Sequence, residues 1–565
     1  MKKKRLLMMG FAAASLMLCA GAAAAETPLF RVGLMTDTHW RENEQSFERT
    51  AAALKVFKRE KVDMICNIGD ISDLHFPWAY RYYRQKLFPS IFPENPPQEI
   101  FVYANHDVLR HDEHGSAVKG NIPECFAAVR KELGVPHAPD ELVVFKGYPF
   151  VVLQQFVTRE TMQKLLAEAA AKFPEGPIFV LDHVPAPRTA DGAKDMRVVE
   201  YDKYPRIVHI YGHVHTPLRD ENSIWQGGHT EVSAGCLQNW RGALIGTAPR
   251  SKECYEFSIM DVYKDKLVFT RYSTEDGKAF KEPWIVPLPF DPATAPYRFD
   301  TRAKNTPAPE FPADAALKLA CDKPFSALTV TWPSMTAGGE PYKFFVGIAK
   351  KGADGEFHEI SRQDSYSEFY LAENKRKGKL SQKLSGGFFD PGVEYRISVT
   401  PVGFFGRTGK PLTAEFTAPA DAVKTKLIFE CKDPMKEMVF AAGLRVKTPL
   451  PVKNGFWQHE SGNARLIIPQ KYWKGAKGTR FRFTVDMDTR QHSDRGWTMV
   501  LRNPVPLKNG NNRIKMPCGE VLNQRYVIEL GKASPKFFYD LLIREGGPGE
   551  IRFKYVKLEQ LPSKN

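Results

Sequence analysis

The first half of the chain alternates apolar runs with amphipathic stretches, from Leu29 to about Tyr272. This alternation is typical of strands separated by helices in an α/β layer fold. The runs that we expect to form strands are LFRVGLMT, VDMICNIG, EIFVYA, FVVLQQF, PIFVLD, RIVHIYG and YEFSIMDVY. The helical candidates between them are SFERTAAALKVFKRE and TRETMQKLLAEAAAKF, and Thr158 is expected to be the N-cap of the second. A fold of this class brings the residues that follow its strands to one edge of a sheet.

Five of these runs end in residues of types that bind metal ions. They supply Asp37 and His39, Asp70 and Asp73, Asn105 with His106 and Asp107, His183, and His213 with His215. In open α/β sheets ligands bind outside the carboxyl ends of the strands, so all five groups should converge. Side chains two positions apart on an extended chain point to the same side, so D-x-H and H-x-H can each offer two ligands. A single histidine would more often be an ordinary core or surface residue, but chance does not explain this ordered set.

The motifs D-x-H, G-D-x-x-D, N-H-D, H and G-H-x-H, in this order, resemble those of the calcineurin-like metallophosphoesterase family over about residues 29–275. The resemblance implies an α/β domain, a β-sandwich flanked by helices, over residues 26–282. It also implies phosphoester hydrolysis at a pair of divalent metal ions. Imidazole, carboxylate and amide ligands suit manganese, iron or zinc better than calcium, and the sequence does not choose among these three metals.

The resemblance also implies a role for each motif residue. The first metal is expected to be bound by Asp37, His39 and His215. The second metal is expected to be bound by Asn105, His183 and His213. Asp70 is expected to bridge the two ions, because a carboxylate has two oxygens and a negative charge to share.

Two further motif residues are expected to be catalytic rather than ligating. By the resemblance, His106 protonates the leaving group or stabilises the phosphoryl charge, and Asp73 pairs with His106, orients it and raises its pKa. One position departs from the family pattern: Ala104 precedes Asn105 where glycine is usual. Either the turn at Ala104 keeps φ negative, or the backbone is slightly displaced.

The N-terminal 25 residues have the features of an export signal. A basic start at Lys2 to Arg5 precedes an apolar run from Leu6 to about Ala20, and the alanines that follow fit a cut after Ala25. A membrane anchor and lipid attachment at Cys19 are the alternatives. There is no other run of 18 or more apolar residues. We therefore expect a periplasmic or extracellular protein with no transmembrane segment in the mature chain.

The second half of the chain is expected to contain a linker and two all-β domains. Eight prolines lie within residues 283–312, which predicts a linker without regular helix or central strand. Residues 313–420 resemble a fibronectin type III β-sandwich, with Tyr395 in FDPGVEYRISVTPVGFFG as a corner tyrosine and Trp332 in the core. Residues 421–565 also show short strand-like runs and predict a second β-sandwich, similar to a jelly roll.

The positive charge of the chain is concentrated in residues 421–565. This segment has 27 Lys+Arg and 14 Asp+Glu, a net +13 of the total +15, while residues 2–5 carry +4 and residues 26–420 therefore −2. A basic domain could hold an exported protein near an anionic envelope polymer, or it could be an ordinary solvated surface. Trp457, Trp473 and Trp497 could form a platform for sugars or belong to the core.

Two functions are compatible with this sequence. The first is an exported dinuclear-metal phosphoester hydrolase that uses a metal-bridging hydroxide and the pair His106 and Asp73. Its substrate could be a nucleotide or a phosphorylated saccharide, and no residue separates monoesters from diesters. The alternative is a non-catalytic protein that binds an envelope polymer or carbohydrate and keeps a vestigial phosphoesterase domain. The complete motif set favours the hydrolase.

Overall fold

The computed structural model describes 16 stretches of the chain. These are residues 26–111, 117–186, 196–238, 255–324, 326–334, 336–384, 386–421, 425–442, 449–459, 464–467, 481–491, 498–501, 513–515, 520–530, 540–544 and 549–562. The expected export signal, residues 1–25, lies outside them, as do Trp473 and Trp497.

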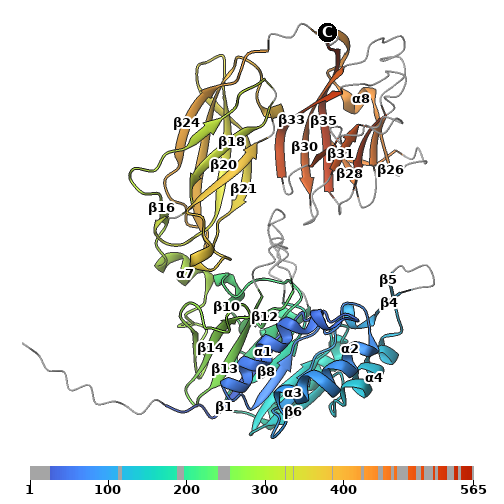
Figure 1. The fold of residues 1–565 in the computed structure, drawn as a ribbon, viewed down its shortest axis with the longest axis vertical. Helices are drawn as coiled ribbons and strands as arrows, with labels where there is room; N and C mark the ends of the chain where they lie inside the picture. The colour runs from blue at the N-terminus through green and yellow to red at the C-terminus, as the bar shows by residue number, and fades with distance from the viewer. Residues whose placement is uncertain are drawn as a thin grey trace, which may run out of the picture.

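The first domain contains two mixed sheets that pack face to face (Figure 1). The first sheet has the order β15-β14-β13-β1-β2-β3, and β12 also pairs with β13. Its strands are β1 (Phe30–Met35), β2 (Met64–Asn67), β3 (Gln98–Phe101), β12 (Gly235–Cys236), β13 (Glu256–Val262), β14 (Lys266–Ser273) and β15 (Trp284–Pro287). Strands β1, β2 and β3 are parallel, so their carboxyl ends lie at one edge of the sheet.

The second sheet has the order β10-β11-β9-β8-β7-β6. Its strands are β6 (Glu141–Phe145), β7 (Tyr148–Leu153), β8 (Ile178–Asp182), β9 (Ile207–Tyr211), β10 (Ile224–Gln226) and β11 (Thr230–Ser233). Strands β7, β8, β9 and β11 are parallel. All seven runs that the sequence predicted as strands in this domain form strands.

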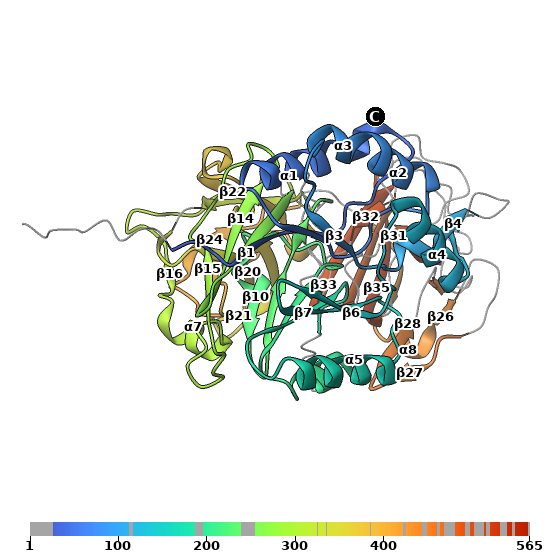
Figure 2. The same cartoon turned by 90° about the horizontal axis from the view of Figure 1, so that it is seen from below.

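Helices cover the outer faces of both sheets, as Figure 2 shows. The main helices are α1 (Glu48–Arg59), α2 (Pro77–Tyr82), α3 (Phe88–Ile91), α4 (Ile122–Leu133), α5 (Arg159–Lys172) and α6 (Met196–Tyr201). Side chains of α1 to α4 pack on the first sheet, and side chains of α5 and α6 pack on the second. Between the sheets lies a fully apolar core that includes Leu34, Cys66 and Phe179. Helix α5 begins as predicted, because the Thr158 side chain accepts a hydrogen bond from the Thr161 amide.

The predicted fibronectin type III-like sandwich is present. A three-stranded sheet contains β17 (Lys318–Ala320), β18 (Leu328–Pro333) and β22 (Lys379–Leu384). It packs on a four-stranded sheet of β20 (Pro341–Lys351), β21 (Phe357–Tyr366), β23 (Glu394–Gly403) and β24 (Leu412–Thr417). Trp332 is buried in the core between them. The Tyr395 hydroxyl accepts a 2.7 Å hydrogen bond from the Asp390 amide, which is the contact expected of a corner tyrosine.

The C-terminal segment forms a second β-sandwich. One sheet contains β25 (Lys426–Cys431), β27 (Val452–Lys453), β28 (Phe456–His459), β30 (Phe481–Gln491), β33 (Glu520–Leu530) and β35 (Gly549–Gln560). The other contains β26 (Val439–Ala442), β29 (Ala464–Ile467), β31 (Thr498–Leu501), β32 (Arg513–Lys515) and β34 (Asp540–Arg544). Trp457 belongs to the core of this domain, so it is not available as a surface platform for sugars.

The structure gives more detail on residues 283–312, where the prolines predict a linker without regular helix or central strand, and it differs from this prediction by containing one short helix. Strand β15 begins at Trp284 and pairs with β14, so the first domain continues into this segment. As an edge strand, β15 tolerates proline because one side needs no ladder hydrogen bonds. Helix α7 (Phe299–Asn305) fits between Pro296 and Pro307.

The segment also joins the first two domains tightly. Arg302 of α7 stacks over the Phe405 ring of the fibronectin-like domain. The same guanidinium pairs with Glu221 of the first domain, at 2.9 Å.

Among the described residues, no helix is long and apolar enough to cross a membrane.

Candidate metal centre

The predicted ligands follow the carboxyl ends of parallel strands in both sheets, and several have an unusual backbone. Five of them adopt the left-handed region, with φ of 52° at Asp37, 44° at His39, 48° at Asp70, 70° at His213 and 51° at His215. A residue with a side chain rarely takes this conformation, which costs about 1–3 kcal/mol where the surroundings enforce it. Such outliers cluster at functional sites. Here they turn successive side chains toward one point at the sheet edge.

Two motif glycines allow the strand ends to approach this closely. A Cβ atom on Gly69 would lie 2.5 Å from Nδ1 of His183, and Gly69 itself has φ of 91°. A Cβ atom on Gly212 would lie 2.0 Å from the Thr36 hydroxyl oxygen. Both distances are impossible for real atoms, so glycine is required before Asp70 and before His213.

The first group of side chains consists of Asp37, His39, Asp70 and His215. One candidate ligand atom of each lies within 4.8 Å of the others. Nε2 of His39 is 3.3 Å from Nε2 of His215 and 3.7 Å from a carboxylate oxygen of Asp70. Nε2 of His215 is 3.1 Å from Oδ1 of Asp37. Four donor atoms of types that bind transition metals therefore face one small volume.

The second group consists of Asp70, His183 and His213, so Asp70 belongs to both groups. Nε2 of His183 lies 3.2 Å from Oδ2 of Asp70. Nδ1 of His183 donates to the Ile68 carbonyl at 2.7 Å, which leaves Nε2 facing the cluster as the candidate ligand atom. The amide of His106, next to Asn105, donates to Oδ1 of Asp70 at 3.0 Å. This contact places the N-H-D turn beside the shared carboxylate.

Several buried ligand atoms lack a hydrogen-bond partner among the described residues. They are Oδ1 of Asp37, Oδ1 of Asn105 and Nε2 of His183. An unpartnered buried polar atom costs about 1–3 kcal/mol, so native proteins rarely leave three of them together. All three atoms belong to residues predicted to bind metal ions. Their clustering fits a site whose missing partners are cations.

The ionisation of the cluster follows from this crowding. Burial raises the pKa of Asp37, but the nearby positive charges of His215, His39 and His183 outweigh it and hold that pKa well below its usual value. Burial lowers the pKa of His183, yet the charge of Asp70 overcomes this effect and raises it to about 9. With these pKa values, the positive charges of protonated imidazoles balance the negative charges of the buried carboxylates.

The environment of His106 differs from the prediction. Its Nδ1 contacts the backbone carbonyl of Asp73 at 2.8 Å and the Asp73 carboxylate only at 3.5 Å. The carboxylate lies closer to Nδ1 of His39, at 3.1 Å, and to Nε of Arg41, at 3.0 Å. Asp73 thus orients His106 through its carbonyl and holds His39 and Arg41 through its side chain.

Asp73 acts on the pKa of His106 in the expected upward direction, but the net shift of this pKa is downward. Burial lowers this pKa, and the nearby carboxylates of Asp70 and Asp73 do not fully offset the effect, because His39 opposes them with a like charge. For Asp73, burial raises the pKa, but the hydrogen bond and charge of His39, with Arg41, bring it down to about 2.

Two details of the N-H-D turn concern residues beside the ligands. Ala104 is not among the residues with positive φ, so the turn keeps φ outside the left-handed region and the missing glycine is not needed. Asp107, which the sequence put among the candidate ligands, is buried and turned into the loop. Its carboxylate accepts from the Ala104 amide at 2.9 Å and from the Ser72 amide at 3.1 Å. Asp107 therefore ties the turn after β3 to the turn after β2.

The structure places three further residues around the cluster that the sequence did not single out. Arg41 contacts Asp73, as described. The Gln155 side chain accepts from the Asn105 amide at 2.8 Å. Arg197 pairs with Asp182, the residue before His183. None of the three lies in a motif, and their partners are distant in sequence, so no pattern along the chain reveals them.

Parts of the chain are similar to a known protein family and to several solved structures. The calcineurin-like phosphoesterase family matches residues 30–217. Among solved structures, a dimetal phosphatase from Danio rerio is 13% identical, with a TM-score of 0.27 and coverage of 46% of this chain and 99% of its own. A purple acid phosphatase from yellow lupin (Lupinus luteus) seeds is 16% identical, with a TM-score of 0.34 and coverage of 46% of this chain and 54% of its own.

A human fibronectin type III domain is 15% identical, with a TM-score of 0.14 and coverage of 21% of this chain and 87% of its own. No curated protein matches the chain. The family match spans the five motifs up to His215, and the structure brings all five together at one edge of the sheets. Residues 30–217 therefore match the calcineurin-like phosphoesterase family.

Proposed function

We propose that this protein hydrolyses phosphoesters with two divalent metal ions. The observation that carries the proposal is the carboxylate of Asp70, which belongs to both groups of ligand atoms. In this assignment Asp37, His39 and His215 hold the first ion, and Asn105, His183 and His213 hold the second. The unpartnered atoms of Asp37, Asn105 and His183 support it, because each gains a partner when the ions bind.

The donor set limits which metals fit. Imidazole nitrogens, carboxylates and one amide oxygen suit manganese, iron or zinc, and no thiolate contributes. Cys66 is buried, and burial raises the pKa of its thiol above the range in which it could ionise in water near neutral pH. When bound, two such ions lower the pKa of a water molecule and stabilise charge on the phosphoryl oxygens.

The residues of the chain have separate tasks in this reaction. The backbone carbonyl of Asp73 fixes Nδ1 of His106, which leaves Nε2 of His106 for the substrate. This nitrogen can donate a proton to the departing oxygen or a hydrogen bond to the phosphoryl group. Asp73 keeps its charge near neutral pH and sets the orientation of His39. His106 is therefore the catalytic residue, and Asp73 is the residue that positions both histidines.

The alternative function, a non-catalytic polymer-binding or carbohydrate-binding protein with a vestigial phosphoesterase domain, has less support. A vestigial site is free to lose ligands, whereas all seven ligand positions and His106 are retained here. The burial of Trp457 also removes one of the three tryptophans on which a sugar platform depended.

A direct assay separates the two functions. Purified protein is stripped with a chelator and reloaded with manganese, iron or zinc, and hydrolysis of a generic phosphate monoester and a generic diester is then measured. We expect metal-dependent hydrolysis of at least one ester, and a matched Asp70→Asn protein should lack it. A protein that binds two ions yet hydrolyses neither ester would support the binding function. Natural substrates to test next are nucleotides and phosphorylated saccharides.

We also propose that the protein is exported and cleaved after Ala25. The basic start, the apolar run and the alanines of residues 1–25 support this proposal. Mass spectrometry of the N-terminal peptide from the envelope and secreted fractions tests it. A chain that begins at Glu26 is expected. An intact N-terminus in the membrane fraction would indicate an anchor, and a lipid-modified Cys19 would indicate a lipoprotein.

The basic C-terminal domain is proposed to bind an anionic envelope polymer. The net charge of +13 over residues 421–565 supports the proposal. Binding of the full chain should weaken steeply with salt, because exposed charges are screened beyond about 8–10 Å near physiological ionic strength. A chain of residues 26–420 should lose the binding and keep ester hydrolysis. Equal binding by this shorter chain would exclude the C-terminal domain as the binding site.

A further inference from the structure

One arginine of helix α6, Arg197, contacts Asp182, the residue that precedes the candidate ligand His183. Arg197 is 6% exposed, although arginine is seldom buried unless it is paired. It lies at the second position of α6, whose other residues pack on the second sheet. The partners of this guanidinium indicate what it does.

The first partner of Arg197 is Asp182, the last residue of β8. Nε of Arg197 donates to Oδ2 of Asp182, and Nη2 donates to Oδ1 at 3.4 Å. The Tyr201 hydroxyl adds a 3.0 Å hydrogen bond to Oδ2, and Oδ1 accepts from the Val184 amide at 3.2 Å. The carboxylate thus holds the chain on both sides of His183, and Arg197 neutralises its buried charge.

The second partner is the chain just after β7. Nη2 of Arg197 donates to the Gln155 carbonyl at 2.9 Å. The side-chain oxygen of Gln155 accepts a hydrogen bond from the backbone amide of Asn105 at 2.8 Å. The backbone amide of Gln155 donates to the Tyr103 carbonyl at 2.9 Å. Gln155 is therefore fixed at its backbone by Arg197 and holds Asn105 with its side chain.

One buried guanidinium consequently connects the supports of Asn105 and His183. These are two of the three residues assigned to the second ion alone. The ligands assigned to the first ion have supports of a different kind. Thr36 donates to Asp37 at 3.0 Å, and Asp73 contacts Nδ1 of His39 at 3.1 Å. The two halves of the centre thus rest on largely different hydrogen bonds, although the backbone amide of His213 also donates to Oδ2 of Asp37 at 3.1 Å.

We propose that Arg197 is a positioning residue for the second metal ion and has little influence on the first. This inference rests on the proposed dinuclear centre. A guanidinium has a rigid planar fork, so it can bond to Asp182 and Gln155 at once in a fixed geometry, which a lysine ammonium does not reproduce. Partners of metal ligands typically contribute about 10–100-fold to metal affinity, and Arg197 supports two ligands together.

The test is a titration of the metal-stripped full chain with Mn²⁺ alone. The number of bound ions and their dissociation constants are measured, together with the electron paramagnetic resonance signal of a spin-coupled ion pair. In Arg197→Lys we expect the first ion to bind as in the unaltered chain. The second should bind at least about 10-fold more weakly, so that a single-ion signal replaces the coupled one.

A matched control is available on the neighbouring helix. Arg159 of α5 pairs with Glu200 of α6 at 2.7 Å, and its side chain is more than half exposed. Arg159→Lys changes the same residue type next to α6, and the partner of Arg159 is Glu200 rather than Asp182 or Gln155. This variant should therefore bind both ions normally. Thermal unfolding of each variant shows whether the fold is retained.

A second variant covers the case in which Arg197→Lys does not fold. Gln155→Ala removes the hydrogen bond to the Asn105 amide and leaves the Arg197 pair with Asp182 in place, and it should also weaken the second ion selectively. Coupled two-ion binding at unaltered affinity in a folded Arg197→Lys, or in Gln155→Ala if the former is unfolded, overturns the inference. Equal weakening of both ions overturns it as well. Failure of the unaltered chain to bind two ions would instead reject the proposed dinuclear function.

Discussion

Two clusters of carboxylates and basic side chains in this protein differ in the partners that surround the carboxylates. The metal-ligand cluster gathers Asp37 and Asp70 with histidines at the edge of the two sheets. The second cluster surrounds Glu221, where the first domain meets α7 and the fibronectin-like domain. We call it the Glu221 cluster, and it comprises Glu221, Arg271, Lys281 and Arg302.

The difference between them is the source of positive charge. Glu221 is surrounded by three permanent cations of the chain, with Arg271 at 3.1 Å, Lys281 at 3.4 Å and Arg302 at 2.9 Å. Burial raises the pKa of Glu221, but these three charges outweigh it and keep the pKa below its usual value. At the metal-ligand cluster, by contrast, carboxylates face imidazoles that can lose their protons. A cluster that brings its own cations is structural, and one that lacks them can bind ions from outside.

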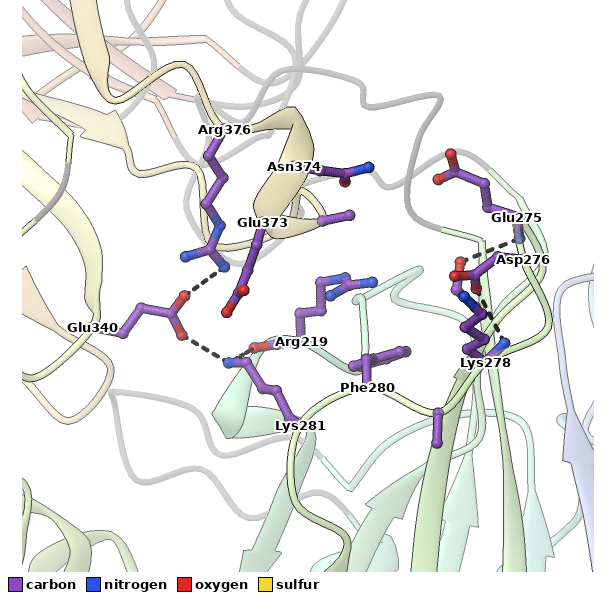
Figure 3. Close-up of a pocket in the computed structure, with 13 residues that line it drawn as sticks. Arg219, Glu275, Asp276, Lys278, Phe280, Lys281, Glu340, Glu373, Asn374 and Arg376 are labelled. Atoms are coloured by element: carbon purple, nitrogen blue, oxygen red, sulfur yellow. Dashed lines mark hydrogen bonds and ion pairs between the residues drawn. The ribbon is translucent and has the colours of Figure 1, made fainter.

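The volume of a cleft indicates a binding site less well than the balance of charges that line it. A cleft of about 670 Å³ lies next to the Glu221 cluster, between Phe280 of the first domain and Glu373 of the fibronectin-like domain (Figure 3). At its wall Glu340 bonds to Lys281 at 2.8 Å and to Arg376 at 2.7 Å. Glu340 thus forms ion pairs with Lys281 and Arg376 at the wall of the cleft, and these pairs help to join the two domains.

The largest effect is expected from Asp70→Asn. Removing the shared negative charge leaves two cations without a common ligand, so both metal content and hydrolysis should collapse. We expect turnover to fall by at least about 10³-fold, because a two-metal clamp contributes several kcal/mol of charge stabilisation. Elemental analysis and ester kinetics measure the two effects. Retention of both ions would show that Asp70 is not the bridge.

The His106→Asn variant separates catalysis from metal binding within the same cluster. This substitution removes no ligand, so both ions should stay bound, while kcat falls by about 10²–10⁴-fold, the usual contribution of a positioned proton donor. The loss should be larger for esters with a poor leaving group. Metal depletion, or unchanged turnover, would contradict the role assigned to His106.

In the Glu221 cluster, Glu221→Ala should destabilise the fold without changing metal stoichiometry. Three cations would lose their common anion in a largely buried joint, and breaking a buried ion pair costs about 3–5 kcal/mol. Denaturant unfolding measures the loss, and Mn²⁺ titration of the folded variant provides the comparison. If this variant lost its metal ions instead, the two clusters would not be independent.

Asp73→Asn should have an intermediate effect, because Asp73 contacts His39 as well as His106. We expect turnover to fall about 10–100-fold and the first ion to bind more weakly, since Asp73 holds the ring of a first-ion ligand. The comparison with His106→Asn, which keeps normal affinity for both ions, is the control. A loss of turnover with entirely normal affinity would indicate that Asp73 acts on His106 alone.

The smallest effect concerns pH at the domain joint. Asp220 is buried beside Glu221, Asn222, Tyr342 and Tyr366, and burial raises its pKa from 3.8 to about 6. A raised folded-state pKa means that the folded state binds more protons, so this contribution to stability is present below about pH 4 and is lost as pH rises through about 6.

The loss amounts to roughly 1.4 kcal/mol per pKa unit. Unfolding of the wild-type chain and Asp220→Asn is compared between pH 4 and pH 7. Relative to Asp220→Asn, the wild-type chain should lose stability as the pH rises. Parallel profiles would show that Asp220 stays ionised in the folded protein.

Much of the fold was predictable from local patterns. The strand runs, the Thr158 N-cap, Trp332 in a core and the Tyr395 corner all depend on periodicity or on neighbouring residues. Strand β15 was missed because prolines hide an edge strand, whose outer side needs no ladder hydrogen bonds. Helix α7 was missed because the density of prolines masked the proline-free stretch between Pro296 and Pro307.

At the candidate site, the sequence indicated the candidate ligands but not how their supports are arranged. It paired Asp73 with His106, whereas the carboxylate lies nearer to His39, a residue 34 positions away. It also did not indicate Gln155 or Arg197. Gln155 contacts Asn105 across 50 positions and Arg197 across 42 positions, and contacts this distant leave no spacing along the chain to recognise.

The candidate metal-binding residues could be found from the sequence, because the identity of each side chain and its place after a strand are local properties. Which carboxylates receive a cation from the chain depended on the folded arrangement. Glu221 meets Arg302 across 81 positions, whereas the groups beside Asp37 and Asp70 that can carry a positive charge are, among the described residues, histidines. The energy of a buried charge depends on every charge within a few ångströms, whatever their separation in sequence, so the distinction between a structural cluster and a candidate metal centre appears only once the chain is folded.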